Sequence, residues 1–139
     1  MKETVLVTGG AGYIGSHTAV ELVQAGFDVV IADNLSNSDL QAVEGVRRIT
    51  GAEVPFEQID CCDLQAMRRL FERHEFRSVI HFAASKAVGE SVAEPLKYYR
   101  NNLLSFLNVV ELMRDFGRPN ILFSSSCTVY GEPDAQPVA

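Results

Sequence analysis

Short apolar runs alternate with longer stretches of mixed polarity along the whole chain. The runs are four to six residues long and rich in β-branched residues, which is typical of strands. We expect strands at residues 4–8, 27–32, 54–59, 78–82 and 121–124. The intervening stretches repeat apolar residues at helical spacing, as Leu64, Met67 and Leu70 do. We expect helices at residues 13–25, 39–50, 64–74 and 95–116.

Strands that are apolar on both faces and separated by helices are typical of a parallel sheet covered on both sides. The sequence therefore predicts an α/β fold with a doubly wound, Rossmann-type parallel sheet. A fold of this class rarely ends after its fifth strand. We therefore expect residues 1–139 to be the N-terminal portion of a longer fold.

The loop after the first strand is rich in glycine and reads T-G-G-A-G-Y-I-G over residues 8–15. Its glycines fit two spacings of the dinucleotide-binding fingerprint, one led by Gly9 and the other by Gly10. We prefer the first, in which Gly9 permits a tight turn, Gly12 lets backbone approach a pyrophosphate, and Gly15 lets the helix pack closely. The alternative is a turn that binds no ligand.

An acidic residue, Asp33, ends the second strand 18 residues after Gly15. A carboxylate at this position accepts hydrogen bonds from the adenosine ribose and repels a 2′-phosphate, and no arginine follows before Arg47. This arrangement favours NAD over NADP. The alternative role for Asp33 is to cap the next helix. Asp60 ends the third strand, where it either lies near the adenine or is a loop aspartate without a ligand.

The composition of the chain limits its expected binding partners and its expected cellular location. The net charge is −6 and no basic run is present, so nucleic acid and anionic membranes are not the expected partners. Three cysteines, Cys61, Cys62 and Cys127, form no metal-binding spacing, and their odd number is typical of reduced thiols. We expect no metal site, no signal peptide, no transmembrane segment and a cytoplasmic location.

Two further segments carry a family resemblance. Residues 79–91 read V-I-H-F-A-A-S-K-A-V-G-E-S, and residues 123–131 read F-S-S-S-C-T-V-Y-G. Together with the glycine-rich loop and D-N-L-S-N-S at 33–38, they resemble the UDP-glucose 4-epimerases of the extended short-chain dehydrogenase/reductase family. The resemblance covers essentially the whole chain. It implies NAD as cofactor and a UDP-sugar substrate, with UDP-galactose and UDP-glucose interconverted by transient oxidation at sugar C4.

The resemblance also implies residue roles. Tyr13 and Ile14 meet the pyrophosphate through backbone, residues 33–38 line the adenosine ribose, and Ser126 assists proton transfer at the sugar 4-hydroxyl. Lys86 lies near both the cofactor and the sugar nucleotide. The implied cofactor-binding residues are Gly9, Gly12, Tyr13, Ile14, Gly15, Asp33, Asn34, Leu35, Ser36, Asn37, Ser38, Asp60, Cys61, Phe82, Ala83, Ala84, Ser85, Lys86 and Asn101.

Several of these residues have plainer alternatives. The alternatives are that Lys86 is a solvated loop lysine, that Asn101 is a residue of the helix surface, and that Ser124–Ser126 form a strand-end turn. Tyr98, Tyr99 and Phe106 are interpreted as packing residues. The apolar residues of the helix at 95–116 either form a homodimer interface, as the resemblance implies, or cover the sheet. These residues are Leu103, Leu104, Leu107 and Val110.

One family feature is missing. The catalytic Tyr-x-x-x-Lys motif follows the segment that ends this chain, and Tyr130 matches the tyrosine of T-V-Y-G instead. We therefore expect the sugar-nucleotide domain and the general base to be absent from residues 1–139. Cys127 and Thr128 replace the Asp-Glu pair of nucleotide-sugar 4,6-dehydratases, which favours an epimerase. Other nucleotide-sugar epimerases and a non-catalytic NAD-binding module remain alternatives.

Overall fold

The computed structural model describes residues 1–85, 88–126, 129 and 131. Its strands are β1 (Thr4–Thr8), β2 (Asp28–Asp33), β3 (Phe56–Gln58), β4 (Phe76–His81) and β5 (Asn120–Phe123). Its helices are α1 (Tyr13–Gln24), α2 (Leu40–Thr50), α3 (Leu64–Arg73), α4 (Val88–Ala93) and α5 (Pro95–Asp115). The expected bounds differ from these by at most two residues. The sequence reasoning missed α4, whose six residues are too few to show a helical repeat.

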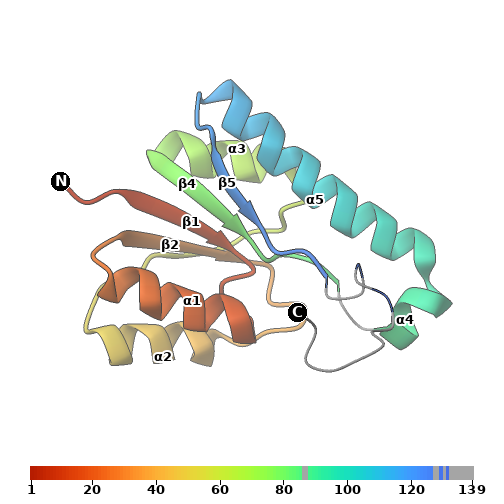
Figure 1. The fold of residues 1–139 in the computed structure, drawn as a ribbon, viewed down its shortest axis with the longest axis horizontal. Helices are drawn as coiled ribbons and strands as arrows, with labels where there is room; N and C mark the ends of the chain where they lie inside the picture. The colour runs from red at the N-terminus through yellow and green to blue at the C-terminus, as the bar shows by residue number, and fades with distance from the viewer. Residues whose placement is uncertain (86–87, 127–128, 130, 132–139) are drawn as a thin grey trace.

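All five strands are parallel and lie in one sheet in the order β3-β2-β1-β4-β5. Figure 1 shows α1 and α2 on one face of the sheet and α3 and α5 on the other. The predicted doubly wound, Rossmann-type fold is therefore confirmed. Thr8 at the end of β1 pairs with Ala32 on one side and with His81 on the other. The loops that follow these strands consequently meet at the carboxyl edge of the sheet.

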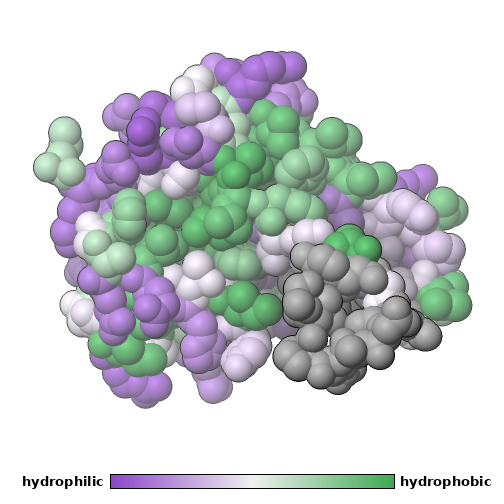
Figure 2. Space-filling view, in the orientation of Figure 1, coloured by the Kyte–Doolittle hydropathy of each residue, from purple (hydrophilic) through white to green (hydrophobic). Residues whose placement is uncertain are grey.

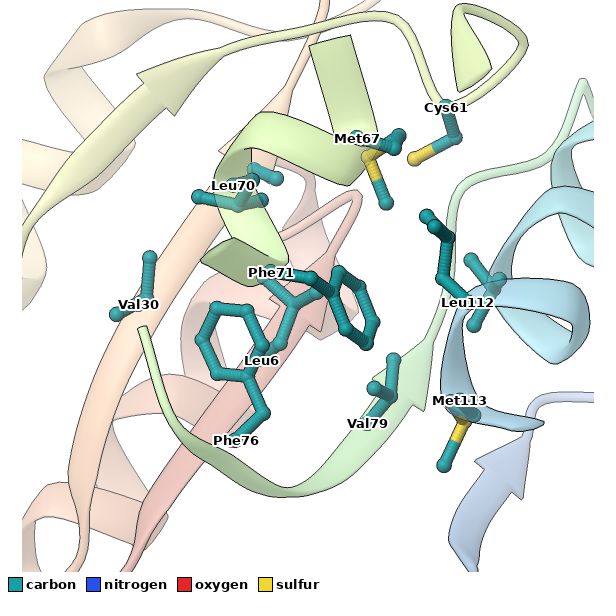
Figure 3. Packing of buried hydrophobic residues seen from close by; sticks show 12 residues of the cluster. Leu6, Val30, Cys61, Met67, Leu70, Phe71, Phe76, Val79, Leu112 and Met113 are labelled. Carbon is teal, nitrogen blue, oxygen red and sulfur yellow. The ribbon is translucent and has the colours of Figure 1, made fainter. Parts of the chain in front are cut away.

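A hydrophobic core lies on each face of the central strand β1. Val5 and Val7 point toward the α1 and α2 side, whereas Leu6 points toward α3 and α5. This alternation is the two-residue period of a strand that is buried on both faces. Figure 3 shows the core on the α3 and α5 side, where the rings of Phe71 and Phe76 pack edge to face with centroids 5.1 Å apart. The sheet is thereby fixed between its two helical layers.

Local sequence sets the helix boundaries. The Asp39 carboxylate accepts a hydrogen bond from Gln41 N at 2.8 Å and begins α2, and Asp63 begins α3 in the same way. Gly51 ends α2 with a φ of +66°, and Pro95 lies in the first turn of α5. Within residues 1–85 and 88–126, no helix is long and apolar enough to cross a lipid bilayer.

Candidate functional site

A cavity of about 430 Å³ opens at the carboxyl edge of the sheet. It lies where the chain order reverses around β1, which is where α/β sheets bind ligands. The lining residues are Gly9, Gly12, Tyr13, Ile14, Gly15, Asp33, Asn34, Ser36, Asn37, Ser38, Ile59, Asp60, Cys61, Phe82, Ala83, Ala84, Ser85, Asn101 and Ser105. All of them except Ile59 and Ser105 are among the cofactor-binding residues that the family resemblance implied.

The glycine-rich loop is packed between β2 and β4. Gly9 has a φ of +68°, and a Cβ there would lie 2.8 Å from Ala83 N. A Cβ on Gly15 would lie only 2.3 Å from the Gly9 carbonyl oxygen, so only glycine fits at this position in the first turn of α1. Gly10, the other candidate for the first fingerprint position, also approaches Ile31 closely. The tight turn and close packing predicted for Gly9 and Gly15 are therefore observed.

The N-terminus of α1 faces the cavity and suits an anion. Its N-cap is Gly12, which provides no side-chain hydrogen bond, and its first turn contains no acidic residue. Tyr13, Ile14 and Gly15 line the cavity there. Because the first turn of a helix has unpaired N–H groups and the positive end of the helix dipole, this cradle fits a phosphate group without a cationic side chain.

The carboxylate of Asp33 joins the glycine-rich loop to the loop after β2. Oδ2 accepts a hydrogen bond from Ala11 N at 3.1 Å. Oδ1 accepts from Leu35 N at 2.9 Å and from Ser38 Oγ at 2.8 Å. The helix-capping alternative for Asp33 is wrong, because Asp39 caps α2. Hydrogen bonds from the glycine-rich loop and from the loop after β2 thus orient the Asp33 side chain, which also borders the cavity.

Leu35 is the expected cofactor-binding residue of this loop that does not line the cavity. Its backbone has a φ of +59°, a conformation that costs energy for a residue with a Cβ. The hydrogen bond to Asp33 holds its N–H, and its side chain packs against the core on the α1 and α2 side. The loop therefore turns its polar residues to the cavity while Leu35 anchors it to the core.

Asp60 and Cys61 follow β3 and form another wall. Asp60 Oδ1 accepts a hydrogen bond from Cys62 N at 2.8 Å and so closes a turn. Cys61 is buried, and its burial, together with the nearby Asp60 carboxylate, raises the pKa of the thiol to about 12. The thiol is therefore neutral near pH 7 and forms an uncharged part of the wall.

Helix α5 holds the loop that follows β4. Asn101 Nδ2 donates to Ser85 Oγ at 2.9 Å, and Ser105 Oγ donates to Ala83 O at 3.4 Å. Asn108 Nδ2 donates to Cys61 O at 2.9 Å and so binds the loop after β3 as well. The helix-surface alternative for Asn101 is wrong. The sequence reasoning overlooked Ser105 and Asn108, although their spacing from Asn101 places all three on one helix face.

The aromatic residues of α5 are only partly as expected. Tyr98 is buried and donates a hydrogen bond from its hydroxyl to Glu90 Oε2 at 2.8 Å, which joins α4 to α5. Phe106 packs against Phe123, with ring centroids 4.9 Å apart. The packing role expected for both is confirmed. The same expectation for Tyr99 is wrong, because its side chain is 66% exposed.

Of the two residues expected to contact the sugar, Ser126 is the one that the structure describes. Ser126 follows β5, is exposed, and is not part of the lining. Its carbonyl oxygen accepts a hydrogen bond from Val129 N at 3.3 Å, which is consistent with the turn alternative. Lys86, Cys127, Thr128 and Tyr130 lie outside the described residues.

Comparison with known proteins gives the family. The family model described as GDP-mannose 4,6 dehydratase matches residues 6–139. The chain belongs to this family. Two curated relatives are the UDP-glucose 4-epimerases of Neisseria gonorrhoeae and Bacillus subtilis, with 56% and 52% identity over 134 residues each. Each alignment covers 96% of this chain and 40% of the relative. The chain thus spans about two fifths of these relatives.

Solved structures of family members agree with the fold. The UDP-glucose 4-epimerase of Bifidobacterium longum, described in complex with NAD⁺ and UDP, has a TM-score of 0.92 and 49% identity. That alignment covers 97% of this chain and 40% of the other. The enzyme of Stenotrophomonas maltophila, described with bound NAD, has the same TM-score and identity and covers 98% and 40%. The resemblance to the N-terminal part of UDP-glucose 4-epimerases is confirmed.

An apolar surface lies beside the site. Figure 2 shows a hydrophobic area over β5 and the adjoining part of α5. Ile121, Leu122 and Phe123 of β5 are exposed. The α5 residues Leu103, Leu104, Leu107 and Val110 are 39% to 58% exposed. The sheet is instead covered by the opposite face of α5, so the sheet-covering alternative for these four residues is wrong.

Proposed function

We propose that this chain binds NAD and forms the cofactor-binding part of a UDP-glucose 4-epimerase. The observation that carries the proposal is the cavity where the glycine-rich loop, Asp33 and the loop after β4 meet. These three features match the three parts of a dinucleotide, namely a pyrophosphate, an adenosine ribose and a nicotinamide. The relatives support the reaction, because those named above are UDP-glucose 4-epimerases.

The cradle at the start of α1 would hold the pyrophosphate through backbone N–H groups. Asp33 would accept hydrogen bonds from the ribose hydroxyls, and its negative charge would disfavour a 2′-phosphate. Asp60 and Cys61 would border the adenine, and Phe82 to Ser85 the nicotinamide side. Bound NAD would supply reversible hydride transfer, and the chain would supply its orientation.

The substrate and the remaining catalytic groups belong to the proposal as well. Lys86 would lie near the sugar nucleotide, and Ser126 would hydrogen-bond the sugar 4-hydroxyl. The general base, the tyrosine of Tyr-x-x-x-Lys, would come from the part of the relatives that this chain does not span. Galactose metabolism in the cytoplasm is the corresponding setting, which suits the free thiols of Cys61 and Cys62.

The exposed apolar row of α5 supports self-association. Leu103, Leu104, Leu107 and Val110 lie along one helix and leave apolar surface open to solvent. A second copy of the chain is the proposed occupant, which would make the protein a homodimer through α5. No nucleic acid or membrane is included among the proposed partners, since the net charge is −6.

The cofactor proposal is tested by titrating the ligand-free chain with NAD and with NADP in a calorimeter. We expect NAD to bind and NADP to bind at least about tenfold more weakly, because its 2′-phosphate would meet Asp33. ADP serves as a control ligand for the adenosine half alone. Equal affinities for NAD and NADP would contradict the proposed ribose role, and failure to bind NAD would contradict the proposed function.

The reaction is tested with a chimera that joins residues 1–139 to the remaining part of the Bacillus subtilis relative, which is 52% identical over the shared region. We expect the chimera to interconvert UDP-galactose and UDP-glucose with NAD. Formation of a 4-keto-6-deoxy sugar would instead indicate a dehydratase, the activity for which the family model is named. A chimera that binds NAD without any sugar-nucleotide activity would favour the non-catalytic module.

A further inference from the structure

Asn102 on α5 binds both backbone groups of Ser85. Its Oδ1 accepts a hydrogen bond from Ser85 N at 2.8 Å, and its Nδ2 donates to Ser85 O at 3.2 Å. The side-chain amide thereby pairs with the chain as a neighbouring strand would, four residues beyond the end of β4. Asn102 itself does not line the cavity, whereas Ser85 does.

The segment from Phe82 to Ser85 is held by hydrogen bonds at Phe82, Ala83 and Ser85. Near β4, Phe82 N donates to Thr8 O at 3.0 Å, which extends the pairing of the sheet. In its middle, Ala83 O accepts the Ser105 hydroxyl. At its far end, Asn102 supplies the two backbone hydrogen bonds to Ser85. Loss of Asn102 would therefore free both backbone groups of Ser85 and leave this end of the segment held only by the hydrogen bond from Asn101 to the Ser85 hydroxyl.

The neighbouring residue Asn101 fixes the orientation of this amide. Asn101 Nδ2 donates to Asn102 Oδ1 at 3.3 Å as well as to Ser85 Oγ. An oxygen at that position of Asn102 is therefore required by two donors, Asn101 Nδ2 and Ser85 N. The remaining nitrogen faces Ser85 O, so each part of the Asn102 amide has a partner of the correct polarity.

We propose that Asn102 is a positioning residue that holds the Ser85 wall of the cavity against the nicotinamide half of the dinucleotide. The inference rests on the proposed function, because it assumes that NAD occupies the cavity with its adenosine half at Asp33. Asn102 acts through the Ser85 backbone and has no contact with the ligand of its own. It contributes to the fit of the nicotinamide half and not to that of the adenosine half.

The test compares two ligands, NAD and ADP-ribose, which shares the adenosine, pyrophosphate and ribose parts but has no nicotinamide. Asn102→Ala removes both hydrogen bonds to Ser85. Asn102→Asp keeps the size and the acceptor for Ser85 N but places an oxygen opposite Ser85 O. The matched control is Asn120→Ala, since Asn120 also donates from its amide to a backbone oxygen, that of Arg77, at the opposite edge of the sheet.

Calorimetric titration of the ligand-free chain gives the two dissociation constants for each variant. We expect both Asn102 variants to weaken NAD by about fivefold to tenfold, corresponding to the loss of one or two hydrogen bonds. The affinity for ADP-ribose should stay within about twofold of the original. Asn120→Ala should leave both constants unchanged.

The outcomes separate the inference from the function on which it rests. Equal losses for NAD and ADP-ribose, or no loss for either, would overturn the positioning role of Asn102. If Asn102→Ala does not fold, the isosteric Asn102→Asp variant decides by the same comparison. An unaltered chain that binds neither ligand would contradict the proposed function itself.

Discussion

Thr8 and His81 face each other at the carboxyl ends of the two central strands, with Thr8 Oγ1 2.7 Å from His81 Nδ1. Both side chains are almost completely buried. The Thr8 hydroxyl also accepts a hydrogen bond from Ala83 N at 3.5 Å, so the pair lies directly beneath the cavity wall. Burial lowers the pKa of His81 from 6.5 to about 4. The imidazole is therefore neutral at physiological pH.

Folding stability should fall as the pH decreases from about 6.5 to 4, because the unfolded chain then binds a proton at His81 that the folded chain does not. The stability from the neutral imidazole is fully present above pH 6.5. About 2 kcal/mol of it should be lost at pH 5, given the shift to about 4. The measurement is urea unfolding at pH 7.5, 6 and 5.

The control for this pH dependence is His81→Asn, which keeps a polar atom near Thr8 but has no proton to bind. All other titrating groups are common to both chains. The variant should therefore lose about 2 kcal/mol less than the original chain between pH 7.5 and 5. Parallel pH dependences would show that His81 does not carry the effect.

Gly15→Ala should destabilise the fold and abolish the phosphate cradle. The added Cβ would lie 2.3 Å from the Gly9 carbonyl oxygen and 2.8 Å from Gly10 Cα, and both obstacles are backbone. We expect a loss of about 2 kcal/mol or more in urea unfolding, together with loss of NAD binding.

Gly45→Ala is the matched control, because a Cβ on Gly45 in α2 meets nothing within 4 Å. This change should raise stability by about 0.5–1 kcal/mol through helix propensity. A Gly15→Ala variant as stable as the original chain would contradict the close approach of α1 to the glycine-rich loop.

Asp33→Ala should weaken NAD far more than NADP in calorimetric titration. The carboxylate that would bind the ribose is lost, and with it the repulsion of a 2′-phosphate, so the preference for NAD should largely disappear. Part of the loss comes from the loops themselves, because Ala11, Leu35 and Ser38 lose their common acceptor.

Asp39→Ala is the control for Asp33→Ala. It distinguishes the ribose role of Asp33 from a general loss of order in the loop after β2. Asp39 caps α2 through Gln41 N, so its removal should cost about 1 kcal/mol of stability. The ratio of NAD to NADP affinity should stay the same in this variant. Equal losses of both dinucleotides on Asp33→Ala would rule out the ribose role.

The sequence predicted the fold and most of the cavity wall because both depend on local patterns. Apolar runs determine the strands, and the spacing of the glycines from Gly9 to Gly15 marks the turn within eight residues of sequence. Asp33 is the last residue of its strand, so its place at the carboxyl edge also follows from the sequence. The family resemblance added the segment from Phe82 to Ser85.

The remaining features depend on contacts between distant segments. Asn108 binds Cys61 across 47 positions, and no pattern near either residue indicates this pairing. Leu35 belongs to a motif that lines the cavity, yet its backbone turns the side chain into the core. Ser126 follows a strand whose neighbouring surface is exposed, so the position of β5 alone does not bring it to the cavity wall.

The apolar row of α5 yields a prediction about assembly. If a second copy covers it, Leu107→Glu should shift the chain from dimer to monomer in sedimentation velocity, because it places a charge in the proposed interface. Leu107 is 58% exposed, so folding stability should change by less than about 0.5 kcal/mol. Ile49→Glu on α2 is the control, since Ile49 is 64% exposed and lies on the other helical layer. An original chain that is monomeric at all concentrations, or a Leu107→Glu variant that still dimerises with unchanged affinity, would contradict the α5 interface.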